Sequence, residues 1–192
     1  MDLSKFTERS RGFIQAAQTI AMRENHQRLL PEHLLKALMD DDQGLAANLI
    51  KRAGGAPERV REAVDAAIAK VPQVSGDTGQ PYLDNATARV LDEAAKVAKK
   101  AGDSFVPVER MLMALVMVKS AAREALEAGA ISAQALNGAI NDIRKGRTAD
   151  SASAEEGYDA LKKYARDLTE AASEGKIDPI IGRDDEIRRA MQ

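Results

Sequence analysis

The sequence predicts an all-α domain built from two copies of a four-helix unit. Apolar residues recur three and four positions apart, which is the spacing of one face of a helix. The pattern of caps, apolar positions and stops also occurs twice, at a separation of 77 positions. The matching pairs are Thr7 and Asp84, Phe13 and Val90, Ala17 and Ala94, Ile20 and Val97, Ala21 and Ala98, Asn25 and Gly102, Glu32 and Glu109, Leu35 and Leu112, Ala37 and Ala114, and Leu38 and Leu115. We therefore expect about eight helices in two halves that are related by a pseudo-two-fold axis.

The composition supports helices and excludes several classes of function. Hydrophobic residues make up 44% of the chain but aromatic residues only 3%, so small and aliphatic side chains must fill the core. The net charge is −2 with both signs interspersed, which argues against a nucleic-acid-binding surface. The absence of cysteine excludes disulfides and thiolate chemistry. No apolar run approaches the roughly 20 residues of a membrane span, and the polar start is no signal peptide. We expect a soluble, cytoplasmic protein.

Caps and breakers divide the first copy into four helices. Thr7 is a typical N-cap for a helix over residues 8–23, and Asn25 suits a left-handed stop. Prolines at the first helical position are expected to open the second and fourth helices, since their missing N–H is harmless there. These prolines are Pro31 and Pro57, and the stops between them are residues 40–42 and Gly54-Gly55.

The second copy repeats this plan after a crossover at residues 71–81, which we expect to be ordered against the surface because Val71 and Val74 are apolar. Asp84 is its first N-cap, and its helices end near Lys145. Gly129 matches Gly54 at an offset of 75 rather than 77, which predicts that the second copy is two residues shorter.

The helical pattern stops at Gly146. No apolar residue larger than alanine occurs in residues 146–157, so we expect a flexible tether there. A helix is predicted over residues 158–173, an extended segment over 176–183, and a last helix from Asp184. The sequence supplies nothing for that helix to pack on, so we expect the chain to stop inside a second domain.

Four stretches resemble known motifs. Residues 30–35 (LPEHLL) are similar to the N-domain signature of the Clp/heat-shock-100 family of AAA+ proteins, and residues 106–112 to its degenerate second copy. Residues 160–183 are similar to the entry of the first AAA+ module, and residues 71–74 (VPQV) and 161–164 (LKKY) favour the disaggregase branch of the family over its protease-linked branch. The resemblance implies an N-domain at residues 1–145 with repeats at about 1–70 and 82–145, a linker at 146–157, and the start of an AAA+ domain at 158–192.

The residues themselves predict no catalysis. The chain has no phosphate-binding G-x-x-x-x-G-K-[ST] loop and no nucleophile with a supporting base. His26 and His33 are the only imidazoles, too few for a metal site at a recognisable spacing. We expect no enzyme activity, cofactor or metal in this chain. The resemblance implies ATP and Mg²⁺ for a longer protein, with Ile180, Ile181 and Gly182 at the edge of the adenine. It also implies a hexamer formed through the AAA+ modules, and a DnaK-type chaperone partner that docks on a middle domain.

The resemblance also implies a substrate-contact region that contains Thr7, Asp103 and Glu109. Each has a structural explanation as well, because Thr7 is a cap, Asp103 follows a helix stop and Glu109 lies in a first turn, where a carboxylate is favourable. Leu91 and Met113 are the apolar residues that we expect to be exposed near the junction of the copies. Arg110 stands where relatives often have an apolar residue, so the chain departs here from the family pattern of the groove expected at the junction of the copies.

The three methionines Met111, Met113 and Met117 allow two interpretations, an adaptable binding surface or ordinary core. We expect an N-domain that captures exposed apolar segments of misfolded or aggregated proteins without ATP. Two alternatives stay open, which are an adaptor-docking domain of a protease-coupled unfoldase and a purely structural domain that packs on the ring.

Overall fold

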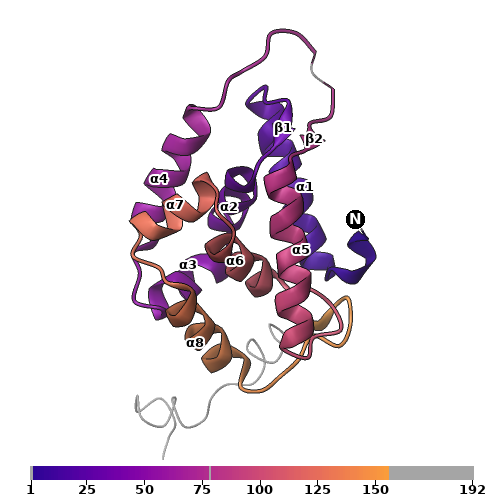
Figure 1. Cartoon of the computed structure of the whole chain (residues 1–192), viewed down its shortest axis with the longest axis vertical. Coiled ribbons are helices and arrows are strands. Elements are labelled where there is room, and N and C mark those ends of the chain that lie inside the picture. The colour runs from indigo at the N-terminus through magenta and orange to yellow at the C-terminus, as the bar shows by residue number, and fades with distance from the viewer. Residues whose placement is uncertain (1, 78, 156–192) are drawn as a thin grey trace, which may run out of the picture. The chain divides into compact units, whose positions relative to one another are not determined.

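Two four-helix repeats form the computed structural model, which describes residues 2–77 and 79–155 (Figure 1). A 3₁₀ helix, η1 (Leu3–Lys5), precedes the first repeat. The first repeat contains α1 (Glu8–Arg23), α2 (Pro31–Met39), α3 (Leu45–Arg52) and α4 (Pro57–Ala69). The second contains α5 (Asn85–Lys100), α6 (Val108–Met117), α7 (Ala121–Ala128) and α8 (Ala133–Arg144). The chain divides into two units after Glu155, and the helices and AAA+ segment predicted beyond that residue lie outside the described residues.

The predicted helix ends are confirmed in both repeats. The Thr7 side chain accepts a hydrogen bond from the Ser10 amide at the start of α1, and Asp84 does the same for Ala86 at the start of α5. Asn25 and Gly102, at equivalent places after these helices, both have positive φ angles, of 54° and 82°. Pro31 and Pro57 occupy the first helical positions of α2 and α4. Local caps therefore fix the helix boundaries, as the sequence predicted.

The helix contacts have the symmetry that a duplication requires. The α1–α2 contact of the first repeat matches the α5–α6 contact of the second. Between the repeats, α4 packs on α7 and α3 packs on α8, so each repeat places its fourth helix on the third helix of the other (Figure 1). This exchange joins the two repeats into one core.

Two short backbone pairings repeat the same symmetry. The strand β1 (Arg28–Leu29) pairs in parallel with β2 (Tyr82–Leu83), and an isolated bridge joins Phe6 to Val106. Adding 77 to Leu29 and subtracting 77 from Leu83 converts one pairing into the other. Side chains follow the same rule, because Ser10 Oγ donates to the Val106 carbonyl at 2.9 Å and Thr87 Oγ1 donates to the Leu29 carbonyl at 2.7 Å. The strand pairing adds a small β element to the predicted all-helical architecture.

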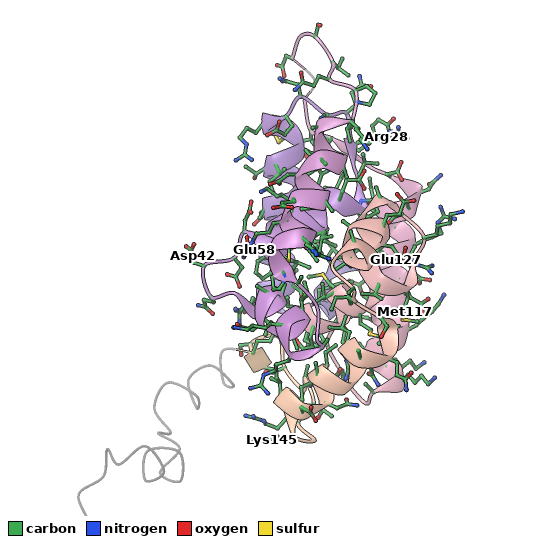
Figure 2. All side chains as sticks on the ribbon, turned by 90° about the vertical axis from the view of Figure 1, so that its left-hand side faces the viewer. Arg28, Asp42, Glu58, Met117, Glu127 and Lys145 are labelled. Carbon is green, nitrogen blue, oxygen red and sulfur yellow. The ribbon has the colours of Figure 1, made fainter. Side chains whose placement is uncertain are left out.

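The core is aliphatic, as the composition predicted, and extends through both repeats. Its largest fully buried side chains are Leu34, Leu35, Leu38, Met39, Leu49, Ile50, Leu91, Met111, Leu112, Leu115, Leu126 and Leu136. Charged side chains such as Arg28, Asp42, Glu58, Glu127 and Lys145 lie on the outside (Figure 2). Among the residues described, no helix combines the length and apolarity needed to cross a membrane.

The structure corrects the predicted length difference between the repeats. The left-handed residue after α7 is Ala130, with a φ of 60°, and it corresponds to Gly54, whose φ is 83°. The offset is therefore 76, and at this point the second repeat has lost one residue rather than two. Gly129 is required for a different reason, since a Cβ atom there would lie 2.3 Å from Val60 Cγ2. Close packing of α4 on the end of α7 explains this glycine, and its backbone φ does not.

Candidate functional site

The structure brings Thr7, Asp103 and Glu109 into one polar network. Thr7 caps α1, Asp103 follows the stop after α5, and Glu109 lies in the first turn of α6. The Thr7 amide donates to the Val106 carbonyl at 3.1 Å, which holds the start of α1 against the entry to α6. The predicted polar residues therefore come from three separate elements and converge at one end of the second repeat.

Asp103 is the centre of this network. Its Oδ2 atom accepts hydrogen bonds from Arg144 Nη1 at 2.7 Å and from Arg110 Nε at 3.2 Å. Its Oδ1 atom accepts from Arg144 Nη2 and, at 2.8 Å, from the Ala149 amide. Burial by itself would raise the pKa of this carboxyl, but the hydrogen bonds from Arg144 and Ala149 outweigh it and the pKa is lowered. Asp103 is therefore an ionised, four-fold hydrogen-bonded structural carboxylate.

Glu109 lies beside the same arginine but in a less favourable setting. Its Oε1 atom is 3.4 Å from Arg144 Nε, and the residue is 6% exposed. Burial, together with the nearby charge of Glu155, raises the pKa of Glu109 to about 7. This carboxyl group is therefore only partly ionised at neutral pH.

A second carboxylate, Glu155, occupies the place between Thr7 and α6. Thr7 Oγ1 donates to Glu155 Oε2 at 2.5 Å, and the amide of Val108 donates to Glu155 Oε1 at 2.6 Å. Val108 is the first residue of α6, where an amide without an acceptor inside the helix and the helix dipole both favour an anion. Glu155 is 4% exposed. The prediction had not singled out this residue, because nothing in its local sequence distinguishes it.

Residues 147–155, here called the strap, run from the end of α8 back to this network. The Ala149 carbonyl accepts hydrogen bonds from the amides of Ser104 and Phe105, both at 3.0 Å, and the Ala152 carbonyl accepts one from Glu8 at 2.8 Å. Ala149 is completely buried. The prediction of a flexible tether is therefore wrong for residues 146–155. The predicted domain end at residue 145 is also wrong, because the first compact unit extends to Glu155. The sequence lacked large apolar groups there, but backbone hydrogen bonds and Glu155 replace them.

The structure also corrects the expected exposure of the predicted site residues. Thr7 is fully buried, and Leu91 and Met113, which we expected to find exposed, are 2% and 8% exposed and belong to the core. Met111 is likewise core, while Met117 is 40% exposed. Arg110 is buried and bonds to Asp103, so its replacement of an apolar residue supports the network rather than a groove.

An open surface lies along α1 instead. Two adjoining hollows, of about 420 and 450 Å³, share Gly12, Gln15 and Gln18 in their lining. Leu3 lies at one end of this α1 groove, and Met22 and Pro81 at the other. Leu3 and Met22 are exposed. The prediction missed this surface, although one signal for it was present, since residues 12–22 contain no charged residue.

The remaining predicted sites have different outcomes. Ile180, Ile181 and Gly182 lie outside the described residues. His26 and His33 are buried against each other, and the described part of the chain contains no group of three side chains arranged to hold a metal ion.

The fold and the sequence define the class of protein. The chain belongs to the Clp repeat (R) N-terminal domain family, which matches residues 5–129. Over its whole length it is 61% identical to chaperone protein ClpB of Agrobacterium fabrum and 59% identical to chaperone protein ClpB of Rhodopseudomonas palustris. The chain spans 22% of the length of these relatives.

Solved structures of low sequence identity share this fold. The N-terminal domain of Hsp104 from Candida albicans matches with a TM-score of 0.70 at 22% identity, over 78% of this chain and 98% of that one. A ClpV N-domain in complex with a VipB peptide matches with a TM-score of 0.59 at 18% identity, over 79% of this chain and 96% of that one.

Proposed function

We propose that residues 2–155 form the client-recognition domain of an ATP-dependent, ring-forming chaperone that solubilises aggregated or misfolded proteins after stress. The two relatives described above carry the name chaperone protein ClpB, and this chain spans 22% of their length. A domain of the same fold in ClpV binds a peptide, which supports a recognition role for such a scaffold. Recognition by residues 2–155 needs no ATP, since it uses only the surface of the domain.

The observation that carries this proposal is the α1 groove, whose charged lining residues, Glu8 and Arg11, both lie in the hollow next to Leu3. The hollow next to Met22 is lined by uncharged residues only. Residues 12–22 of α1 contain no charge, whereas residues 89–99, the equivalent part of α5, contain five charged residues. Asp92 and Lys96 form an ion pair at 2.8 Å on that α5 surface. Because the two helices are otherwise equivalent by symmetry, the loss of charge on one of them favours an apolar ligand there.

The client class follows from the lining. Glycine, alanine and glutamine side chains offer a shallow surface with neutral hydrogen-bonding groups, and Leu3 and Met22 provide exposed apolar contacts at the two ends. Glu8 and Arg11 add one charge of each sign at the Leu3 end. Met22 is flexible and can adapt to clients of different shape. The groove therefore suits an apolar, weakly bound segment of an unfolded chain. Thr7, Asp103 and Glu109 remain a proposed second contact region.

The remaining functional predictions concern the longer protein. We propose that it uses ATP and Mg²⁺, with Ile180, Ile181 and Gly182 bordering the adenine, and that it assembles as a hexamer in the cytoplasm. Cooperation with a DnaK-type chaperone would depend on a middle domain. The alternative of an adaptor-docking domain predicts one folded partner rather than many unfolded clients, and the alternative of a ring-packing domain predicts no client at all.

Gly12 offers a direct test. A Cβ atom at Gly12 would meet nothing within 4 Å, so Gly12→Phe should fill the α1 groove without disturbing the core. Gly138 in α8 is also an exposed helical glycine with open space around it, and Gly138→Phe is the matched control. Binding of fluorescently labelled casein, which is unfolded in solution, should weaken about tenfold for Gly12→Phe and stay unchanged for Gly138→Phe.

Equal casein affinity for Gly12→Phe and the unmodified chain, with both folded by circular dichroism, would contradict the groove assignment. Absence of casein binding in every form, together with tight binding to one folded adaptor, would favour the docking alternative instead.

A further inference from the structure

The strap is held mainly by hydrogen bonds rather than by apolar burial. Within residues 147–155 only Ala149 and Glu155 are buried. An alanine side chain buries little apolar surface, so the apolar contribution to holding the strap is small. The attachment therefore depends on the Glu155 carboxylate, on the hydrogen bond from the Ala149 amide to Asp103, and on backbone hydrogen bonds to Glu8, Ser104 and Phe105. Such an attachment can open without unfolding the helices below it.

The other repeat has an equivalent segment without this anchor. Residues that follow α4 contact the turn after α1, because the Val74 amide donates to the Asn25 carbonyl at 2.9 Å. The position equivalent to Val108 is Pro31, which has no N–H, and the position equivalent to Thr7 is Asp84, which is acidic. Both groups that bind the Glu155 carboxylate, Thr7 and Val108, are thus without a counterpart at the symmetry-related place. Of these two places in the described structure, only the one between Thr7 and α6 can bind a carboxylate in this way.

The strap covers the same residues that were predicted to contact clients. Thr7 Oγ1 and the Asp103 carboxylate both bond to it, and the carboxyl group of Glu155 lies close enough to Glu109 to raise the pKa of Glu109. A client segment can reach these groups only after the strap has moved away.

We propose that residues 147–155 form a releasable strap, anchored by Glu155, and that strap and client exclude each other at the Thr7–Asp103–Glu109 site. The part that concerns clients rests on the proposed function. The ligand class follows from the occupant. It is a segment with a small residue whose carbonyl meets the Ser104 and Phe105 amides, followed by a turn and, six positions after the small residue, an acidic residue. The neighbouring Glu109 weakens the anchor when it is ionised, because two buried carboxylates then repel each other.

Amide hydrogen exchange measured by NMR on the 192-residue chain tests the strap without any client. In Glu155→Ala the amides of Glu8, Ser104, Phe105 and Val108 should exchange about tenfold faster, since a hydrogen bond to a charged group has been lost. The amides of Tyr82 and Asp84, which donate to Gln27 and Leu29 and have no bond to the strap, are the reference and should not change. Glu62→Ala, which removes an exposed carboxylate from α4, is the charge-matched control. Unchanged exchange at Glu8 and Val108 would overturn the proposal.

A synthetic peptide with the sequence of residues 147–155 tests the ligand class. It should bind Glu155→Ala about tenfold more tightly than the unmodified chain, because the apparent affinity rises with the fraction of open site. The same peptide with alanine at its last position should bind neither. Equal binding of both peptides would contradict the assignment of a carboxylate site.

Casein separates this proposal from the proposed function. The peptide should reduce casein binding to Glu155→Ala, and failure to compete would overturn the mutual exclusion. If neither the unmodified chain nor any variant binds casein, the proposed function is contradicted. Amide hydrogen exchange and peptide binding would still decide whether the strap is releasable.

Discussion

The Nδ1 atom of His26 lies 2.8 Å from the Nε2 atom of His33, and both rings are buried. The Leu30 amide donates to His33 Nδ1 at 2.9 Å, so this nitrogen is an acceptor and the ring proton is on Nε2. His33 therefore donates to His26 and caps the start of α2 at the same time. The pair holds the turn after α1 against α2 in its neutral form only.

The same two places in the second repeat contain an ion pair. Adding 77 to His26 and His33 gives Asp103 and Arg110, whose Oδ2 and Nε atoms are 3.2 Å apart. A neutral pair and a charged pair thus perform the same structural task, joining the turn after the first helix of the repeat to its second helix. Because one pair must stay neutral and the other charged, they respond differently to pH and to mutation.

Acid should weaken the domain through the histidine pair. Burial, and then repulsion from His26, lowers the pKa of His33 to about 4 from an ordinary 6.5, and burial also lowers the pKa of His26. A lowered pKa in the folded state means that stability present above pH 6.5 is lost as the pH falls toward 4. We expect a loss of about 2–3 kcal/mol in the free energy of unfolding, measured by urea denaturation.

Other groups affect this titration. Glu24 and the Val71 backbone raise the pKa of His26 and so oppose the effect of burial, but they stay in place in each variant. Glu109 titrates in the opposite direction, so the series is measured in Glu109→Gln. Replacing His33 by Gln should remove most of the acid-dependent slope, and a slope that persists would assign it to other groups.

Asp103→Ala should destabilise the domain severely. The change leaves the buried Arg110 and Arg144 without their shared carboxylate and removes the acceptor of the Ala149 amide. Breaking a buried ion pair in this way costs about 3–5 kcal/mol. Urea denaturation should show this loss, whereas Asp92→Ala, in an exposed ion pair, should change little. A folded Asp103→Ala chain of normal stability would contradict the network, and reduced client binding by this variant reports misfolding rather than contact.

The helical architecture could be predicted from local signals. Thr7, Asp84, Pro31 and Pro57 act through their own backbone and side chain, so their roles are visible in the sequence. The repeat at an offset of 77 then predicted the symmetry. Gly129 shows the limit of this reasoning, because the contact with Val60 that explains it comes from a distant helix.

The site was predicted only in part, for a related reason. Thr7, Asp103 and Glu109 do converge, but their burial depends on Ala149 and Glu155, which lie in a stretch with little apolar character. Composition indicates disorder when apolar burial is low, and it cannot detect a segment held by backbone hydrogen bonds. Leu91 was expected on the surface because the contacts that bury it come from the fold as a whole.

Two glycines should respond in opposite ways to alanine. Gly129→Ala places a Cβ atom 2.3 Å from Val60 Cγ2 and 3.1 Å from the Ala56 carbonyl oxygen, which forces α4 and α7 apart. We expect a loss of about 1–3 kcal/mol. Gly12→Ala meets no neighbour within 4 Å in the middle of α1 and should gain about 0.5–1 kcal/mol from helix propensity. Thermal unfolding of both variants decides the point, and a stabilised Gly129→Ala chain would contradict the proposed close packing.

Alkaline conditions should loosen the strap through Glu109. Burial and the charge of Glu155 raise the pKa of Glu109 to about 7 from 4.5, although Arg144 and Arg110 act in the opposite direction. A raised pKa in the folded state means that stability present below pH 4.5 is lost as the pH rises through 7. Between pH 6 and pH 8 the midpoint of thermal unfolding should therefore fall by a few degrees.

Amide hydrogen exchange tests the same effect at the strap. Intrinsic amide exchange also accelerates with pH, so the Glu8 and Val108 amides are compared with those of Tyr82 and Asp84 at each pH. The protection of Glu8 and Val108 relative to this reference should decrease as the pH rises. In Glu109→Gln the side chain stays neutral, and neither change should occur; an unaltered pH dependence in that variant would assign the effect to a different group.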